Sequence, residues 1–229
     1  MTPEQESINL NAMQARVLGA LMEKELTTPD AYPLTLNSLV LACNQKTSRE
    51  PVSHYESGAV QHCLRELADA GLVHVEWGSR ADRYAQRLTR TLGIDKPVQA
   101  LLNVMMLRGP QTLNELMSRC QRMYSFESSE AIGEILAHQC DKVAPIIRHL
   151  PRQPGQREDR YMHLLCGEPD INATAYTSAG SRQTTASGHE QRIEALEETV
   201  ALQQQLIEQM QEQLALLLAL NIDQSDMPA

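Results

Sequence analysis

The sequence contains few aromatic residues and no long apolar run. Only one of the 229 residues is Phe and one is Trp, which leaves little surface for stacking single-stranded bases. The longest apolar runs, 100–107 and 214–220, are much shorter than the roughly 20 residues of a membrane-spanning helix. The N-terminus is acidic and polar, unlike a secretory or mitochondrial leader. We therefore expect a cytoplasmic protein that does not enter a membrane.

The sequence also lacks motifs for catalysis, metal binding and disulfide pairing. It has no G-x-S-x-G, no phosphate-binding glycine loop and no H-E-x-x-H, so we expect no enzyme and no cofactor. The five cysteines show no C-x-x-C spacing, and Cys43, Cys63 and Cys120 fall on apolar helical positions typical of reduced core thiols. The seven histidines have no metal-ligand spacing. Among them, His163 falls in a predicted strand, where a surface position suffices.

The net charge of −9 is distributed unevenly along the chain. Residues 166–229 hold two basic and ten acidic side chains, a balance of −8, and residues 1–30 carry −3. Residues 31–100 and 101–165 each carry +1. The acidity therefore belongs mainly to the tail, and the middle of the chain permits a local basic patch.

The middle of the chain is a tandem repeat. The block 34–39, which closes at Cys43, returns 77 residues later as 111–116, which closes at Cys120. The triplet Asp-Arg-Tyr at 82–84 reappears at 159–161 with the same spacing. A unit of about 75 residues is long enough for its own core, so we expect two small domains of one kind.

Each repeat predicts three helices followed by a β-hairpin. In the first repeat, Asn11 caps one helix, Thr35 begins a second, and a third ends at Gly71. The buried stripe of the third helix is Val60, Cys63, Leu64 and Leu67, and residues 73–77 pair with 83–88. The second repeat predicts helices over 98–107, 112–120 and 131–139 and strands over 146–150 and 161–165.

This order, with the middle helices set as a helix-turn-helix, is the winged-helix arrangement. The fold class we expect is mainly α with small β-hairpins (α+β), as two tandem winged-helix domains over 11–92 and 93–167 after an N-terminal tail, 1–10. Residues 168–189 have a linker composition. Residues 190–221 predict a helix with a heptad seam, before a tail over 222–229.

The heptad seam predicts a homodimer formed through the C-terminal helix. Branched side chains recur at one seam position, which favours two parallel strands, and Gln203 weakens the seam and helps to fix its register. Leu202, Leu206 and Leu218 beside the seam leave open an amphipathic helix that folds back on its own protein.

Several long strings resemble a known family. They are MEKELTTPDAYPL at 22–34, ACNQKTSREPV at 42–52, LRGPQT at 107–112 and REDRYMHL at 157–164. These strings resemble the YceH family of uncharacterised bacterial proteins, over roughly residues 10–167. The resemblance implies a tandem winged-helix fold and supplies no reaction, ligand or DNA site.

The outward face of the third helix decides whether the first repeat binds DNA. Removal of the buried stripe leaves Gln61, His62 and Arg65 outward, and Gln and Arg side chains read adenine and guanine in the major groove. We expect phosphate contacts from the preceding loop and the wing: Lys46, Arg49, Arg80, Arg83 and Arg87. Glu56, Glu66 and Asp69 on the same helix favour instead a solvated surface of mixed charge.

The second repeat lacks these reading side chains. Alignment of the two third helices puts Gly133 where Gln61 stands and Ala137 where Arg65 stands. Its wing is basic, with candidate contacts at Arg152, Gln153, Gln156, Arg157 and Arg160. We expect a DNA-binding or transcription-regulatory protein, with duplex DNA as partner. The alternative is an adaptor or scaffold that uses the winged helices to bind a protein.

Overall fold

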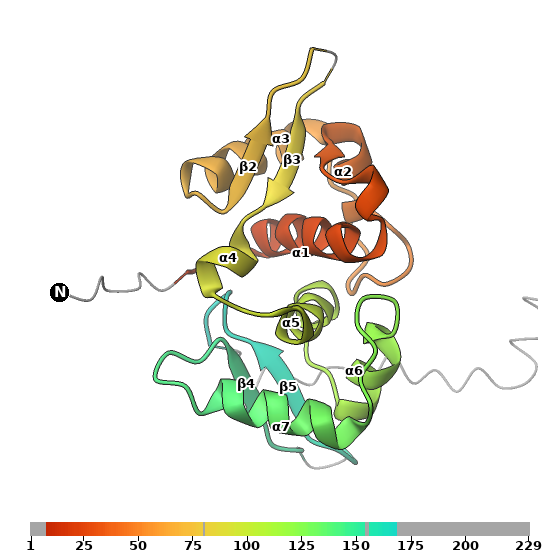
Figure 1. Cartoon of the computed structure of the whole chain (residues 1–229), viewed down its shortest axis with the longest axis vertical. Helices are drawn as coiled ribbons and strands as arrows, with labels where there is room; N and C mark the ends of the chain where they lie inside the picture. The colour runs from red at the N-terminus through yellow and green to blue at the C-terminus, as the bar shows by residue number, and fades with distance from the viewer. Residues whose placement is uncertain (1–7, 80, 154–155, 169–229) are drawn as a thin grey trace, which may run out of the picture. The chain divides into compact units, whose positions relative to one another are not determined.

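The computed structural model describes residues 8–79, 81–153 and 156–168, which lie within one compact unit over Met1–Ile171. The predicted C-terminal helix 190–221, the tail 222–229 and the predicted linker, except its first residue, lie outside the described residues. Within the described residues the fold is mixed α/β, with seven α-helices, one 3-10 helix and two small antiparallel sheets (Figure 1). None of these helices combines the length and apolar character needed to cross a membrane.

The elements of the first half begin where the sequence predicts. Asn11 caps the first helix by accepting a hydrogen bond from the backbone N–H of Gln14, and the Thr35 hydroxyl caps the second in the same way. The elements are α1 (Ala12–Thr27), η1 (Pro29–Ala31), β1 (Leu34–Thr35), α2 (Leu36–Cys43), α3 (Ser57–Asp69), β2 (Val73–Glu76) and β3 (Arg83–Gln86). The predicted stripe of α3 is buried, and Gly71 follows the helix with a positive φ of 72°.

The hairpin is confirmed, but its second strand is shorter than predicted. The three-stranded sheet has the order β1-β3-β2, and Val75 lies opposite Tyr84 in the antiparallel β2–β3 pair. The strand ends at Gln86 instead of continuing to Leu88, and helix α4 (Leu88–Leu92) follows. The Gln86 side-chain oxygen accepts a hydrogen bond from the Thr89 N–H at 3.0 Å, which satisfies a free donor of the first turn. Leu88 is buried, so the helix also completes the core.

The second half repeats the order of helices and hairpin. Its elements are α5 (Lys96–Arg108), α6 (Leu113–Cys120), α7 (Ser129–Cys140), β4 (Ile147–Leu150) and β5 (Arg160–His163). Thr112 and Glu115 form a capping box at the start of α6. Gln111 makes an isolated bridge to Tyr161, in the position that β1 occupies in the first half.

The structure confirms the prediction for three cysteines but not the one for His163. Cys43, Cys63 and Cys120 are buried free thiols, as predicted, and burial raises the pKa of Cys43 to about 12. The surface position expected for His163 is wrong. Its side chain packs inside the second half, where burial lowers its pKa to about 4, and Nδ1 has no partner among the described residues.

The two halves share a core, because their first helices pack against each other. Gly19 and Asn103 meet where α1 and α5 come together: Asn103 Nδ2 donates to the Gly19 carbonyl at 2.6 Å. A Cβ on Gly19 would lie 2.8 Å from Leu107 Cδ2, so glycine permits the close approach.

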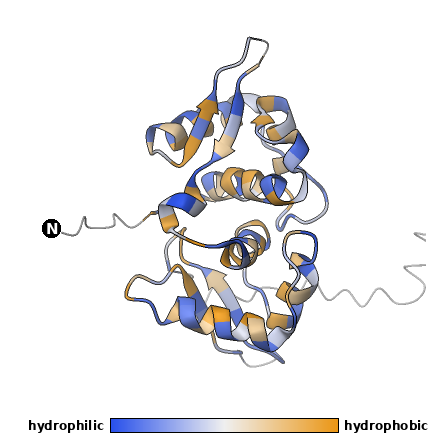
Figure 2. Cartoon of the chain, viewed as in Figure 1, coloured by the Kyte–Doolittle hydropathy of each residue, from blue (hydrophilic) through white to orange (hydrophobic). Residues whose placement is uncertain are grey.

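Both central helices are buried over most of their circumference. Residues 15–22 of α1 and 98–107 of α5 are all buried. Figure 2 shows apolar segments on both helices. The sequence assigns Leu10 to the N-terminal tail, but the Leu10 side chain is buried. The N–H of Leu10 also donates to the Leu165 carbonyl at 2.6 Å. The two repeats therefore depend on each other for burial of apolar surface.

Candidate nucleic-acid interface

Helix α3 presents the three side chains that the sequence places outward. Gln61, His62 and Arg65 are exposed, because Val60 and Leu64 turn the opposite face into the core. Gln61 and Arg65 are four residues apart and lie on one face of the helix, one turn from each other. Their exposure agrees with the predicted geometry, and their role in binding stays a prediction.

Acidic side chains border this face. His62 Nε2 lies 3.4 Å from Glu66 Oε1, and Glu66 also accepts a hydrogen bond from Gln14 of α1 at 3.2 Å. Glu66 is therefore engaged with its own protein on two sides. Asp69 is exposed at the end of the helix. The face has mixed charge, and its cations lie toward the hairpin.

The β2–β3 hairpin contributes two exposed arginines with neutral partners. Arg83 Nη1 donates to the Pro33 carbonyl at 2.8 Å, and Arg87 Nη2 donates to His74 Nδ1 at 3.0 Å. Neither of these partners is a carboxylate, so both guanidinium groups are available to an anionic ligand. Residue 80, predicted as a third wing contact at Arg80, lies outside the described residues.

The hairpin and the outward face of α3 adjoin each other. Tyr84 of β3 is buried, and burial raises its pKa. Asp82 adds to that shift in pKa, while the positive charge of Arg65 opposes it. Helix α3 packs against β2, the strand that pairs with β3. This packing brings α3 and the base of the wing together on one side of the first half.

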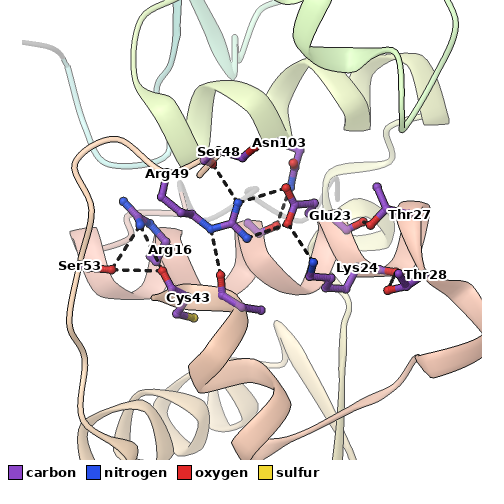
Figure 3. A network of polar contacts seen from close by, with 12 residues as sticks. Arg16, Glu23, Lys24, Thr27, Thr28, Cys43, Ser48, Arg49, Ser53 and Asn103 are labelled. Atoms are coloured by element: carbon purple, nitrogen blue, oxygen red, sulfur yellow. Dashed lines mark hydrogen bonds and ion pairs between the residues drawn. The ribbon is translucent and has the colours of Figure 1, made fainter. Parts of the chain in front are cut away.

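The loop between α2 and α3 corrects one site prediction. Lys46 is exposed, as a phosphate contact requires. Arg49 is 4% exposed and does not face solvent, so its assignment as a phosphate contact is wrong. Its guanidinium pairs with Glu23 of α1 at 2.7 and 3.1 Å and donates to the Ala42 and Ser48 carbonyls (Figure 3). Arg16, also buried, donates to the Pro51 carbonyl at 2.7 Å and helps to fix the same loop.

The second half places its predicted residues around a basic hairpin. Arg152 and Arg157 are exposed, whereas Arg160 Nη1 donates to the Pro110 carbonyl and to Glu115 Oε2, both at 2.9 Å. Gln156 Oε1 accepts from the Gln153 N–H at 3.2 Å. Arg160 is thus held by its own half, and both glutamines make contacts within the hairpin.

A hollow of about 480 Å³ lies between this hairpin and the starts of α6 and α7. Arg152 and Arg157 line it together with Glu158 and Asp159. Asn114 donates to Glu158 at 3.1 Å, and Asp159 accepts from the Arg152 N–H at 2.9 Å. Because the charges of its lining balance, the hollow is less suited to a polyanion than the first half. Across the described residues, no three His, Cys, Asp or Glu side chains are grouped as a metal site.

Sequence reasoning missed one exposed side chain of the first half. Trp77 continues the alternation of Val73 and Val75, which suggests burial, but it is 84% exposed. Trp77 lies just beyond the end of β2, and a side chain past the last paired residue has no helix beneath it. This position could have indicated that Trp77 is exposed.

Comparison with known proteins gives consistent matches over most of the chain. A family profile described as "Protein of unknown function, DUF480" matches residues 10–156. A UPF0502 protein of Cellvibrio japonicus is 60% identical over 209 residues, covering 91% of this chain and 94% of that protein. UPF0502 proteins of Azotobacter vinelandii and Ectopseudomonas mendocina are 48% and 49% identical over 192 and 189 residues. These two matches each cover 82% of this chain, and 83% and 86% of those proteins. The matches agree with the YceH resemblance, and this chain belongs to the DUF480 (UPF0502) family of bacterial proteins.

Proposed function

We propose that this chain is a non-enzymatic tandem winged-helix protein whose first repeat binds duplex DNA. Support for the winged-helix assignment comes from the order of elements in the first half, α1-β1-α2-α3-β2-β3, with β1 beside β3 in the sheet. The second half has the same order, with the Gln111–Tyr161 bridge in place of β1. In this arrangement α3 is the helix that enters the major groove, and the β2–β3 hairpin is the wing.

The observation that carries the proposal is the exposed pair Gln61 and Arg65 on α3, together with two exposed arginines, Arg83 and Arg87, whose hydrogen-bond partners are neutral. A Gln side chain makes paired hydrogen bonds with adenine, and an Arg side chain does so with guanine. The equivalent positions of α7 hold Gly133 and Ala137, which have no side chain able to read a base. The second half therefore acts as a spacer or adds backbone contacts through Arg152 and Arg157.

Phosphate contacts are assigned to the remaining cations of the first half. Lys46, Arg83 and Arg87 are exposed, and Arg80 belongs to the same turn in the sequence. Release of counterions by about four phosphate contacts predicts a slope near −3 to −4 in a plot of log affinity against log salt.

The test is a fluorescence anisotropy titration of random duplex DNA with the full chain across a salt series. Arg83→Ala with Arg87→Ala is expected to weaken binding to every sequence and to reduce the salt slope by about 2. Arg90→Ala with Arg122→Ala is the charge-matched control, because both side chains are exposed and lie outside α3 and the wing. The proposal fails if the wild-type chain does not bind at about 50 mM salt, or if the double variant behaves like the control.

Base reading is tested separately with a sequence selected from a random library. Gln61→Ala and Arg65→Ala are expected to lose discrimination at one base pair each, by roughly 10-fold, while affinity for random duplex falls less. The third helix of the second half, α7, is expected to behave differently. Gly133→Gln with Ala137→Arg should leave the selected DNA sequence unchanged, because α7 is not proposed to read bases.

A second candidate function is an adaptor that binds a protein through the first winged helix. The observation in its favour is exposed apolar surface on and after α2, where Leu41 is 72% and Val52 is 44% exposed. Exposed apolar side chains support a protein interface more than a phosphate backbone. Absence of DNA binding by the wild-type chain at low salt would favour this candidate.

We also propose that the chain forms a homodimer through residues 190–221 and acts in the cytoplasm, where chromosomal DNA is accessible. The heptad seam in the sequence supports the dimer. A dimer presents two first repeats to DNA, and two weak sites on one duplex bind far more tightly than one.

A further inference from the structure

The wing carries an exposed indole that the proposed function does not use. Trp77 is the chain's single tryptophan and lies directly after β2, with 84% of its surface exposed. Leu64 and Leu67 of the first half are buried, whereas Leu41 is 72% exposed, so Trp77 is the most exposed of the large apolar side chains described in this half. A large aromatic group left in water offers apolar area at little conformational cost to a binding partner.

The strand register places Trp77 on the side of the wing that borders α3. Side chains alternate along a strand, so Val73, Val75 and Trp77 share one face. Val75 lies opposite Tyr84, and β2 packs against α3. Trp77 is two residues farther from the core on the same face. The hairpin that carries it extends away from the helices (Figure 1).

The setting of Trp77 is suited to nucleic acid mainly in shape. Arg83 begins the returning strand and Arg87 follows the end of that strand, and their hydrogen-bond partners are a carbonyl and an imidazole. Glu76 and Asp82 are the opposing charges: Glu76 lies opposite Arg83 in the register, and Asp82 precedes Arg83 in the chain. The turn is tight: a Cβ on Gly78 would collide with the Ala81 carbonyl oxygen. A narrow turn is small enough to enter a minor groove.

We propose that Trp77 inserts its indole between base pairs of the minor groove while α3 occupies the adjacent major groove. Apolar wedges from wings and arms unstack a base step and bend the duplex, and the bend brings more protein surface into contact with DNA. This inference rests on the proposed function and assigns Trp77 as a binding residue within it. The ligand is duplex DNA, and a protein partner for the indole is the competing outcome.

The single tryptophan makes the test direct, because all tryptophan fluorescence of the full chain comes from position 77. Titration with unlabelled duplex is expected to quench and shift this emission, with the same midpoint as the anisotropy of a labelled duplex. A duplex containing 2-aminopurine near the wing contact is expected to brighten as the base unstacks. Both signals report contact at the indole and not simply binding by the chain.

Substitution supplies the energetic measurement. Trp77→Ala is expected to weaken duplex binding roughly 10-fold, in line with the loss of one aromatic contact to bases. The salt slope is expected to stay unchanged, because an indole releases no counterions. Trp77→Phe is expected to recover most of the affinity. Val143→Ala, at a fully exposed apolar position of the second half, is the matched control and is expected to bind like wild type.

The outcomes separate this inference from the proposed function. If the wild-type chain binds duplex DNA but neither the emission nor the Trp77→Ala affinity changes, the wedge is wrong and DNA binding stands. If Trp77→Ala weakens binding while emission and 2-aminopurine signals of the wild type stay flat, the indole acts through the turn and the wedge is again wrong. If the wild-type chain does not bind at low salt, both proposals fall and a protein partner for Trp77 is favoured.

Discussion

Replacement of Arg49 by Ala is expected to destabilise the protein severely. The Arg49 side chain is fully buried and its guanidinium makes four hydrogen bonds, two of them to the Glu23 carboxylate at 2.7 and 3.1 Å. The other two, to the Ala42 and Ser48 carbonyls at 3.0 and 2.9 Å, fasten the end of α2 to the loop that leads to α3. The change would leave Glu23 and the Ala42 carbonyl without this donor.

The magnitude follows from the loss of one partner of a buried ion pair. Such losses cost about 3–5 kcal/mol, because the remaining charge stays in a low-dielectric site. For a unit of this size, about 2–4 °C of Tm accompanies each kcal/mol, so the Tm is expected to fall by roughly 10 °C. Glu23→Gln should cost a comparable amount, because it leaves the fully buried Arg49 guanidinium without its counterion, although the amide oxygen still accepts one hydrogen bond.

The assay is urea unfolding of the full chain followed by circular dichroism. Lys46→Ala is the control, because Lys46 is exposed in the same loop, and it should change the free energy of unfolding by less than about 0.5 kcal/mol. A double-mutant cycle with Glu23→Gln should show coupling between the two positions. A loss below about 1 kcal/mol for Arg49→Ala would mean that the pair behaves as a solvated surface ion pair, and would refute the reasoning.

Three further predictions test other parts of the chain. The pKa of His163 is about 4 in the folded protein, against an ordinary value of 6.5, so the unfolded chain takes up a proton first as the pH falls. The free energy of unfolding should therefore fall by about 3 kcal/mol as the pH drops from 6.5 to 4. Urea unfolding of His163→Met over this range should give a flatter profile, and an equal slope in both proteins would contradict this. Gly19→Val should cost about 1–3 kcal/mol in the same assay, because the new valine side chain meets Leu107. Gly133→Ala has room for its Cβ and should be neutral or stabilising. Equal effects of the two changes would be inconsistent with close packing of α1 on α5. Deletion of 190–229 should reduce the mass in light scattering to that of one shortened chain, and a monomer before and after the deletion would exclude the coiled-coil dimer.

Helix starts were predictable because they depend on local chemistry. Asn11 and Thr35 cap helices with their own side chains, and these bonds involve backbone groups only three residues away. The α3 stripe was equally clear, because burial on one face of a helix imposes a period of 3.6 residues on the sequence. The short helix α4 was missed because five residues carry too little periodicity to distinguish it from the end of a strand.

The errors at the candidate site arose where contacts distant in sequence decide exposure. Arg49 looks like a loop cation, but its partner Glu23 lies 26 residues earlier, and no local pattern joins them. His163 occupies a strand whose faces look alike in the sequence, and only the packing of the second half buries it. The shared core of the two repeats was unpredictable for the same reason, since a repeat alone gives no indication of how its copies meet.

The packing of α1 on α5 bears on how the halves of this chain can change over time. When the first helices of two copies pack against each other, the contact resembles that between two identical subunits, here within one polypeptide. In a pair of separate identical subunits, a mutation that suits one copy is imposed on both. Covalent fusion removes that constraint, so one module is free to lose its reading side chains while its twin keeps them, and the pairing that both need for stability persists.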